Sequence, residues 1–234
     1  MTMKNSLARV ALRTVAAAAA LVAFSANAAV DVLDFSGLQN NEAVLSYYSG
    51  GTGSLGSTGG PNYGIVFGSD TIACASQLQG GSCNTAEIPG GPGAKIVYFL
   101  TGPGDVMNVA GGFDTGFSFF YSATGFTGAV TVYDGLNGTG NVLATLNLSL
   151  TPTAGDPGCH GESYCPFEAA GVTFAGTARS VNFSGTANYI GFADITIGSS
   201  SAGGLPAVPE PANIGLMMAG LAVVAGVARR RSAR

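Results

Sequence analysis

Short runs rich in apolar and β-branched residues recur between positions 30 and 197, and Gly, Pro, Asn or Asp bounds each of them. Runs of this length and composition, separated by turn residues, predict β-strands. The expected strands are 30–35, 43–48, 63–67, 95–100, 117–121, 129–133, 142–148, 169–174, 180–183 and 189–197. In 142–148 every even-numbered residue is apolar, so that face is expected to be buried.

Glycine content narrows the fold class. The chain contains 37 glycines and no tryptophan. Because glycine costs chain entropy and weakens helices, a fold with many turns is favoured. About ten strands within 29–198 predict one all-β domain, an antiparallel β-sandwich or jelly roll. The glycine-rich segment 49–60 is expected to be a mobile loop, and 199–207 a flexible linker.

The first 28 residues have the features of a secretory signal peptide. A lysine and two arginines precede an apolar run at 15–24, and 25–28 reads Ser-Ala-Asn-Ala. Cleavage is expected after Ala28, once the secretion machinery has exported the chain. The alternative, an N-terminal transmembrane anchor, requires a longer apolar run.

The segment 208–234 combines three features in a fixed order: a proline-containing motif, an apolar run at 212–228 and a basic cluster. The motif consists of Val208, Pro209, Glu210 and Pro211, and the cluster of Arg229, Arg230, Arg231 and Arg234. At about 1.5 Å per residue the apolar run reaches the short limit for a single transmembrane helix. The positive-inside rule places the arginines in the cytoplasm and the preceding domain on the other side.

This order of features resembles the PEP-CTERM sorting signal of bacterial proteins that exosortase, a membrane protease-transpeptidase, processes. The resemblance implies transient anchoring in the inner membrane through 212–228 and cleavage near 208–211 by an exosortase-like enzyme. A permanent anchor is the alternative. Segments 32–38, 112–121, 130–135 and 190–196 also look like the carbohydrate-binding-module-like jelly rolls of PEP-CTERM ectodomains, which implies a fold but no ligand.

The charge of the exported part limits its partners. Seven of the nine basic residues lie in the two terminal segments. The part between 29 and 208 therefore contains only two basic residues, Lys95 and Arg179, but twelve acidic residues. The resulting net charge of −10 repels phosphate backbones and excludes nucleic acid as a partner. It is compatible with solubility and with divalent cations.

Four cysteines, Cys74, Cys83, Cys159 and Cys165, all lie in the exported part. An even number in an oxidising compartment predicts disulfides, and the short separations favour Cys74 with Cys83 and Cys159 with Cys165. The competing interpretation is a zinc site, but the spacings are not those of CxxC pairs and His160 is the only histidine.

The chain carries no signature of nucleophilic or metal-dependent hydrolysis, and His160 has no sequence context for a triad. Carboxylate pairs for glycoside hydrolysis would have to come from loop acids. The candidates are Asp105, Asp114, Asp134, Glu162 and Glu168, without a spacing that selects any pair.

Calcium is the one cofactor that the acids suggest. If the first and last strands pair, Asp34 and Asp194 come close together, and loop carbonyls can complete an oxygen cage for a structural calcium ion. The competing interpretation is that Asp34 caps a turn and Asp194 faces water.

Tyrosines offer flat faces and hydroxyls of the kind that sugar-binding surfaces use. The candidates are Tyr47, Tyr48, Tyr63, Tyr121, Tyr133, Tyr164 and Tyr189. Burial of these tyrosines in the sandwich is the competing interpretation.

Together these features predict an exported, non-enzymatic surface or extracellular-matrix protein, structural or adhesive in a biofilm or exopolysaccharide matrix. The alternatives are a carbohydrate-binding module for extracellular polysaccharide and, with less support, a glycoside hydrolase.

Overall fold

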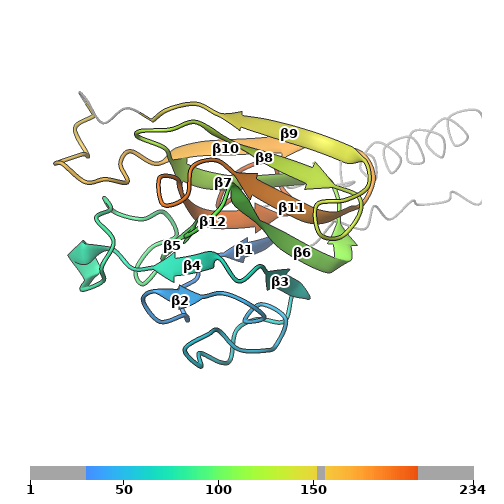
Figure 1. Ribbon diagram of the computed structural model, residues 1–234, viewed down its shortest axis with the longest axis horizontal. Coiled ribbons are helices and arrows are strands. Elements are labelled where there is room, and N and C mark those ends of the chain that lie inside the picture. The colour runs from blue at the N-terminus through green and yellow to red at the C-terminus, as the bar shows by residue number, and fades with distance from the viewer. Residues whose placement is uncertain (1–29, 152–155, 205–234) are drawn as a thin grey trace, which may run out of the picture.

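Two antiparallel sheets pack face to face as a β-sandwich in the computed structural model, which describes residues 30–151 and 156–204 (Figure 1). One sheet has the order β10 (Glu168–Thr173), β7 (Gly116–Ser122), β12 (Gly191–Ile197), β5 (Ile96–Phe99), β4 (Thr71–Cys74) and β2 (Glu42–Ala43), and β1 (Asp31–Leu33) also pairs with β12. The other has the order β3 (Ile65–Phe67), β6 (Gly104–Phe113), β11 (Ala178–Ser184), β8 (Gly128–Tyr133) and β9 (Val142–Leu148).

The first and last strands pair, which is the condition that the calcium hypothesis required. Asp31 lies opposite Ile197 and Leu33 opposite Ile195 in an antiparallel register. The single helical element within the described ranges is the 3-10 helix η1 (Gln77–Gln79). In the same ranges no helix is long and apolar enough to cross a membrane, and the expected signal peptide and the helix at 212–228 lie outside them.

Aromatic side chains from both sheets fill the space between them. Phe119 of β7 contacts Phe192 of β12 edge to face at 5.4 Å, and Phe192 contacts Phe183 of the facing sheet at 5.0 Å. Such pairs add about 0.5–1.5 kcal/mol beyond the area that they bury. A second, smaller apolar cluster is separate from this core and includes Ile96 and Tyr164.

Most of the predicted strands are confirmed, but two strands were missed. The missed strands are β4 and β6, and β6 is the longest of the fold with ten residues. Its sequence contains three glycines, an aspartate and an asparagine, which lowers its β propensity. Pairing with β3 on one side and β11 on the other overrides that propensity. Conversely, the predicted strand 43–48 overlaps the observed strand β2 only at Ala43.

The predicted alternation in β9 holds in part. Ala144, Leu146 and Leu148 point inward as expected, but Val142 is 56% exposed. The register changes between Val132–Ala144 and Tyr133–Val142, so a β-bulge places one extra residue in β9. The bulge turns Val142 outward and lets Leu143 pack against the core instead.

The glycine-rich segment 49–60 is a correction to the sequence analysis, because it has a defined hydrogen-bonded conformation around Glu42. The Glu42 side chain is fully buried, and its carboxylate accepts the backbone N–H groups of Gln39 (2.6 Å), Leu55 (2.8 Å) and Ser57 (3.0 Å) as well as the Ser57 hydroxyl. A buried anion with four donors organises the loop. Gly53 permits this approach, since an added Cβ would lie 2.3 Å from Glu42 Oε1.

Candidate functional site

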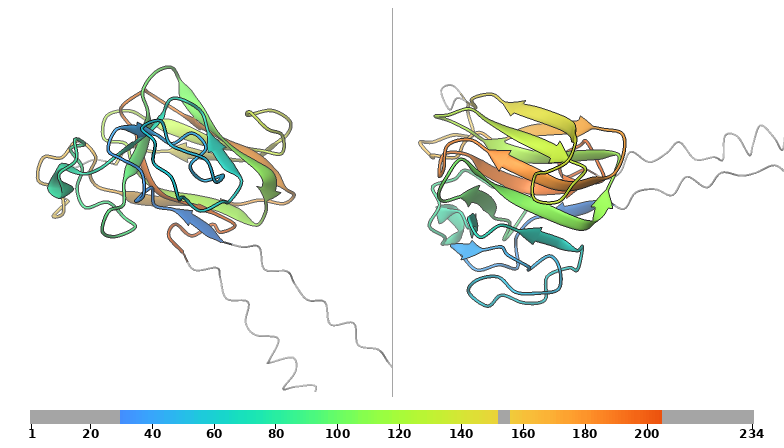
Figure 2. Two further views of the ribbon diagram at one scale, coloured as in Figure 1. Left: turned by 90° about the horizontal axis from the view of Figure 1, so that it is seen from below. Right: turned by 45° about the vertical axis from the view of Figure 1, so that its right-hand side comes forward.

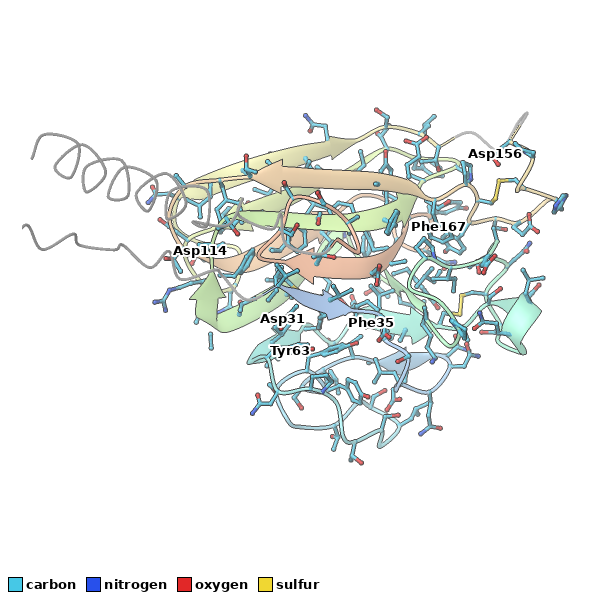
Figure 3. All side chains as sticks on the ribbon, turned by 180° about the vertical axis from the view of Figure 1, so that it is seen from behind. Asp31, Phe35, Tyr63, Asp114, Asp156 and Phe167 are labelled. Atoms are coloured by element: carbon cyan, nitrogen blue, oxygen red, sulfur yellow. A yellow bond between two sulfur atoms is a disulfide. The ribbon has the colours of Figure 1, made fainter. Side chains whose placement is uncertain are left out.

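Two disulfide-bonded loops meet at one end of the sandwich. The bonds join Cys74 with Cys83 and Cys159 with Cys165, which is the pairing that the short separations favour. Figure 3 shows both bonds near Asp156 at one end, with Asp114 at the other. Disulfides are typical of proteins in oxidising compartments, so the domain suits an extracellular or surface location.

The two loops are joined to each other through Tyr164. Its backbone N–H donates to the carbonyl of Asn84 (3.1 Å), and its carbonyl accepts the N–H of Ala86 (3.2 Å). The pairing of Thr85 with Tyr164 is a short parallel bridge between residues that are 79 positions apart in the chain. Each disulfide therefore supports one side of a shared structure.

A groove of about 510 Å³ opens at this junction. It is lined by Asn41, Ser82, Cys83, Asn84, Tyr98, Thr124, Gly125, Ser163, Tyr164, Asn188 and Tyr189. The volume falls within the range of about 300–1,000 Å³ that is typical of small-ligand sites. No charged side chain belongs to this lining, although the domain around it is strongly acidic.

Aromatic rings differ in how they contribute to the groove. Tyr164 is nearly buried, its hydroxyl donates to the Asn188 carbonyl (3.0 Å), and burial raises the pKa of its phenol to about 12. This buried, hydrogen-bonded ring forms one wall of the groove. Tyr189 is 51% exposed and contacts Phe126, which is 45% exposed, edge to face at 4.6 Å. These two rings form an exposed aromatic pair at the groove.

The chemistry of the groove suits a neutral ligand with many hydroxyl groups. Side-chain amides and hydroxyls both donate and accept hydrogen bonds, as sugar hydroxyls do. Exposed tyrosine and phenylalanine rings offer apolar faces for the C–H faces of pyranose rings. An anionic ligand would find no cation among the lining residues to pair with.

Of the seven tyrosines that the sequence suggested, the groove uses Tyr164 and Tyr189. Tyr47, Tyr48 and Tyr121 are buried in the main core instead, which corrects their assignment to a binding surface. The Tyr48 hydroxyl is fixed there by the N–H of Phe35 (2.8 Å), and burial raises its pKa.

Tyr98, Asn188 and Phe126 contribute to the groove or its aromatic pair and were not anticipated. Tyr98 lies on β5 and packs on the second apolar cluster. Asn188 has a φ of +62° directly before the exposed Tyr189. A turn-forming asparagine beside an aromatic residue is the one local feature of the sequence that marks this place.

None of the five acids considered for hydrolysis lines the groove. Asp105 accepts the Thr71 hydroxyl (2.7 Å) and the N–H of Asp70 (3.1 Å), so it supports the β3–β4 connection. Asp134 accepts the backbone and side-chain N–H groups of Asn141 and closes the β8–β9 turn. Glu162 accepts the N–H of the exposed His160, and Glu168 lies on β10.

A smaller pocket of about 360 Å³ lies at the opposite end, where β1 begins and β12 ends. Asp31, Asp114 and Tyr63 are among its lining residues. Burial raises the pKa of the Asp31 carboxyl. Within the part of the chain that the structure describes, no group of three or more His, Cys, Asp or Glu side chains is placed to hold a metal ion.

For the two acids of the calcium hypothesis, the structure agrees with the competing interpretation at Asp34 and contradicts it at Asp194. Asp34 caps a turn by accepting the N–H of Ser36 (3.0 Å), but Asp194 does not face water, because it is only 6% exposed. Burial and the negative charge of Asp34 both raise the pKa of the Asp194 carboxyl. An added Cβ at Gly203 would lie 2.5 Å from Asp194 Oδ2, so the chain closes tightly around this carboxylate.

The sorting motif Val208, Pro209, Glu210 and Pro211 and the cluster Arg229, Arg230, Arg231 and Arg234 lie outside the described residues. Their assignment therefore stays a prediction from the sequence.

No protein-family model matches the chain, and no curated protein matches it. Among solved structures, it is similar to the K2 cleaved adhesin domain of Lys-gingipain, with 15% identity and a TM-score of 0.44 over 72% of this chain and 99% of that chain. It is also similar to a carbohydrate-binding module from Cellvibrio mixtus lichenase 5A (16% identity, TM-score 0.32, 58% of this chain and 95% of that chain).

A third similar structure is a glycoside hydrolase family 43 arabinoxylan arabinofuranohydrolase from Bacillus subtilis (18% identity, TM-score 0.35, 58% of this chain and 27% of that chain). These likenesses are too remote to indicate a ligand or an activity for this chain.

Proposed function

We propose that this protein is an exported surface or matrix protein that binds neutral polysaccharide through the groove between its disulfide-bonded loops. The observation that carries the proposal is the lining of that groove, in which amides, hydroxyls and tyrosine rings occur without a charged side chain. In an acidic domain, an uncharged lining favours neutral glycans over uronic acids or sulfated sugars.

The position of the groove supports an adhesive role. Asp31 and Ile197, where the first strand begins and the last ends, pair at the end of the sandwich opposite the groove. Figure 2 shows the described chain starting and finishing on that side. A domain attached there would present its groove outward.

Binding is tested with immobilised neutral polysaccharides, by affinity electrophoresis or a glycan array with the exported protein. We expect retention on at least one neutral glycan, and about tenfold or greater weakening in Tyr189→Ala, because a central exposed aromatic residue contributes strongly to binding. The matched control is Tyr133→Ala, which removes a half-buried tyrosine of β8 outside the groove.

Retention on acidic glycans only, or equal weakening by both tyrosine variants, would contradict the groove as the binding site. Failure to bind any glycan would favour the second candidate, a structural matrix component with no defined glycan ligand. Turnover of a glycan that disappears when one acid is neutralised would instead show a hydrolase.

Sorting by an exosortase-like enzyme is the second part of the proposal, and its support is the order of motif, apolar run and arginine cluster in 208–234. Intact-mass measurement of the protein from its native cells tests both terminal cleavages together. We expect a chain that begins near Ala29 and has lost the arginine cluster. A mature protein that keeps Arg234 would contradict transient anchoring.

A structural calcium ion is proposed at Asp194 because its carboxylate is buried and receives no hydrogen bond from the residues that the structure describes. Burial and the charge of Asp34 both disfavour the ionised form of this carboxyl. Asp194 and the neighbouring Asp34 would hold the ion, which would supply the missing positive charge.

A further inference from the structure

The six residues 199–204, which follow β12, fold back onto β7 and β12, and we call this segment the latch. The Ser118 hydroxyl of β7 donates to the Ser199 carbonyl (2.9 Å). The Gly203 N–H donates to the Thr196 hydroxyl of β12 (3.1 Å). This part of the predicted flexible linker is therefore fixed to the sheet.

Two further hydrogen bonds lie within the latch. The Ser201 N–H donates to the Ser199 hydroxyl (3.1 Å), and the Gly204 N–H donates to the Ser201 carbonyl (3.0 Å). Strand β10 lies so close that a Cβ added at Gly171 would overlap the carbonyl oxygen of Ser200. The latch is thus packed against the sheet as well as hydrogen-bonded to it.

The composition of the latch makes its closure weak. Its sequence is Ser-Ser-Ser-Ala-Gly-Gly, so it buries no large apolar side chain. Fixing the backbone of such a segment costs conformational entropy, and each hydrogen bond contributes only a modest net stabilisation. Segments with few buried apolar contacts open locally at a low cost in free energy. The latch is therefore expected to exchange between a closed and an open state.

Closure shortens the free chain in front of the sorting motif at 208–211. With the latch closed, the last fixed residue is Gly204, and the four steps from there to Val208 reach at most about 14 Å. With the latch open, the last fixed residue is Gly198, whose N–H donates to the Gly116 carbonyl (3.0 Å). Ten steps then reach about 35 Å.

We infer that the latch regulates cleavage at the sorting motif, a step that rests on the proposed sorting function. A domain of this size has a radius of gyration of about 15 Å. The closed latch leaves three free residues before the motif, so the domain lies against any enzyme that holds the motif. The open latch leaves nine, which is enough chain to separate the two. The exosortase-like enzyme therefore cleaves from the open state.

The test measures the rate of C-terminal cleavage by pulse–chase of the full precursor in its native cells, with intact mass to identify the product. Ser118→Ala removes a donor to the latch. It is expected to speed cleavage about tenfold, because a minor open state is populated at roughly 10% or less. Ser122→Ala is the matched control, since Ser122 is equally buried on β7 but its hydroxyl has no hydrogen-bond partner in the described chain. It is expected to leave the rate unchanged.

A spacer variant separates the reach of the chain from the state of the latch. Six Gly and Ser residues inserted after Gly204 give a closed latch the nine free residues of the open one. The insertion is expected to speed cleavage as much as Ser118→Ala does, and the two changes together should be no faster than either alone.

Hydrogen exchange of the Ser201 N–H in the purified protein reports the latch directly. Exchange should be faster in Ser118→Ala, but not in Ser122→Ala or in the spacer variant. The protein is kept in chelator, so that an ion at Asp194 beneath Gly203 does not contribute.

Four outcomes overturn the inference: an unchanged cleavage rate in Ser118→Ala, equal acceleration in both serine variants, a spacer without effect, or exchange at Ser201 that Ser118→Ala does not alter. Loss of Arg234 at one rate in all variants would leave the sorting proposal intact and remove only the role of the latch. A native protein that keeps Arg234 would remove both.

Discussion

Two regions of this sandwich bury a carboxylate in opposite ways. Glu42 is fully buried beneath the glycine-rich loop and accepts hydrogen bonds from three backbone N–H groups and a hydroxyl. Asp194 is almost as buried in the last strand, has a φ of +53°, and receives no such donors from the described chain. The fold gives Glu42 four donors, whereas no described residue donates a hydrogen bond to the Asp194 carboxylate.

Because of this difference in hydrogen bonding, the pKa values of the two carboxyls shift in opposite directions. At Glu42, burial alone would raise the pKa, but the bonds from the Ser57 hydroxyl and from the N–H groups of Gln39, Ser57 and Leu55 outweigh it and lower the pKa. At Asp194, burial and the charge of Asp34 raise the pKa together. A buried acid with donors is a structural anchor, whereas a buried acid without them is a candidate ligand for a cation.

The largest expected effect comes from removing the anchor. Glu42→Ala leaves three loop N–H groups without acceptors and is expected to lower the free energy of unfolding by about 3 kcal/mol. Chemical denaturation of the variant measures this loss. The control is Glu87→Ala, since Glu87 is exposed and its removal should change stability by less than about 0.5 kcal/mol. Equal effects of the two variants would remove the distinction between anchored and exposed acids.

A smaller effect is expected from calcium at Asp194. At a hundredfold excess over its Kd, calcium should stabilise the native protein by about 2.7 kcal/mol, measured as a rise in Tm that a chelator reverses. Asp194→Asn keeps the shape and tolerates the left-handed backbone, and it should abolish the calcium response while raising Tm in chelator. A calcium response that is unchanged in Asp194→Asn would move the site elsewhere, and no response in the native protein would remove it.

The smallest effect is the pH dependence of these two contributions, which should have opposite signs. For Glu42, with a folded pKa below the unfolded value near 4.5, the contribution to stability is complete above that value and is lost as pH falls through the folded pKa. The stability advantage of the native protein over Glu42→Gln should therefore shrink in acid.

For Asp194, with a folded pKa above the unfolded value near 3.8, native stability is lost as pH rises from that value through the folded pKa. In chelator, the stability of Asp194→Asn relative to the native protein should therefore grow with pH. Thermal melts of the native protein and both variants between about pH 3 and 7 measure these slopes. Slopes of the same sign would contradict the comparison.

Local features were the ones that could be predicted from the sequence. The hairpin of β8 and β9 follows from alternating apolar residues around a turn rich in glycine and asparagine. The two disulfides follow from short cysteine separations. In contrast, β6 was missed because its glycines contradict its final state, and only its two neighbouring strands explain why it is extended.

The groove could not be predicted in the same way. Its lining comes from segments near residues 41, 83, 98, 124, 164 and 188, and no local pattern connects them. Two of its tyrosines were among the candidates, but so were Tyr47, Tyr48 and Tyr121, which look the same in sequence and are buried in the core.

Sequence by itself determined the strand-and-turn composition and the charge, and it favoured one of the three possible cysteine pairings, because these depend on residue type and short separations. Only the tertiary structure decided which tyrosines line a surface and which acid has donors. Burial and hydrogen bonding depend on contacts between segments that are far apart in the chain, and such contacts produce no periodic pattern in the sequence.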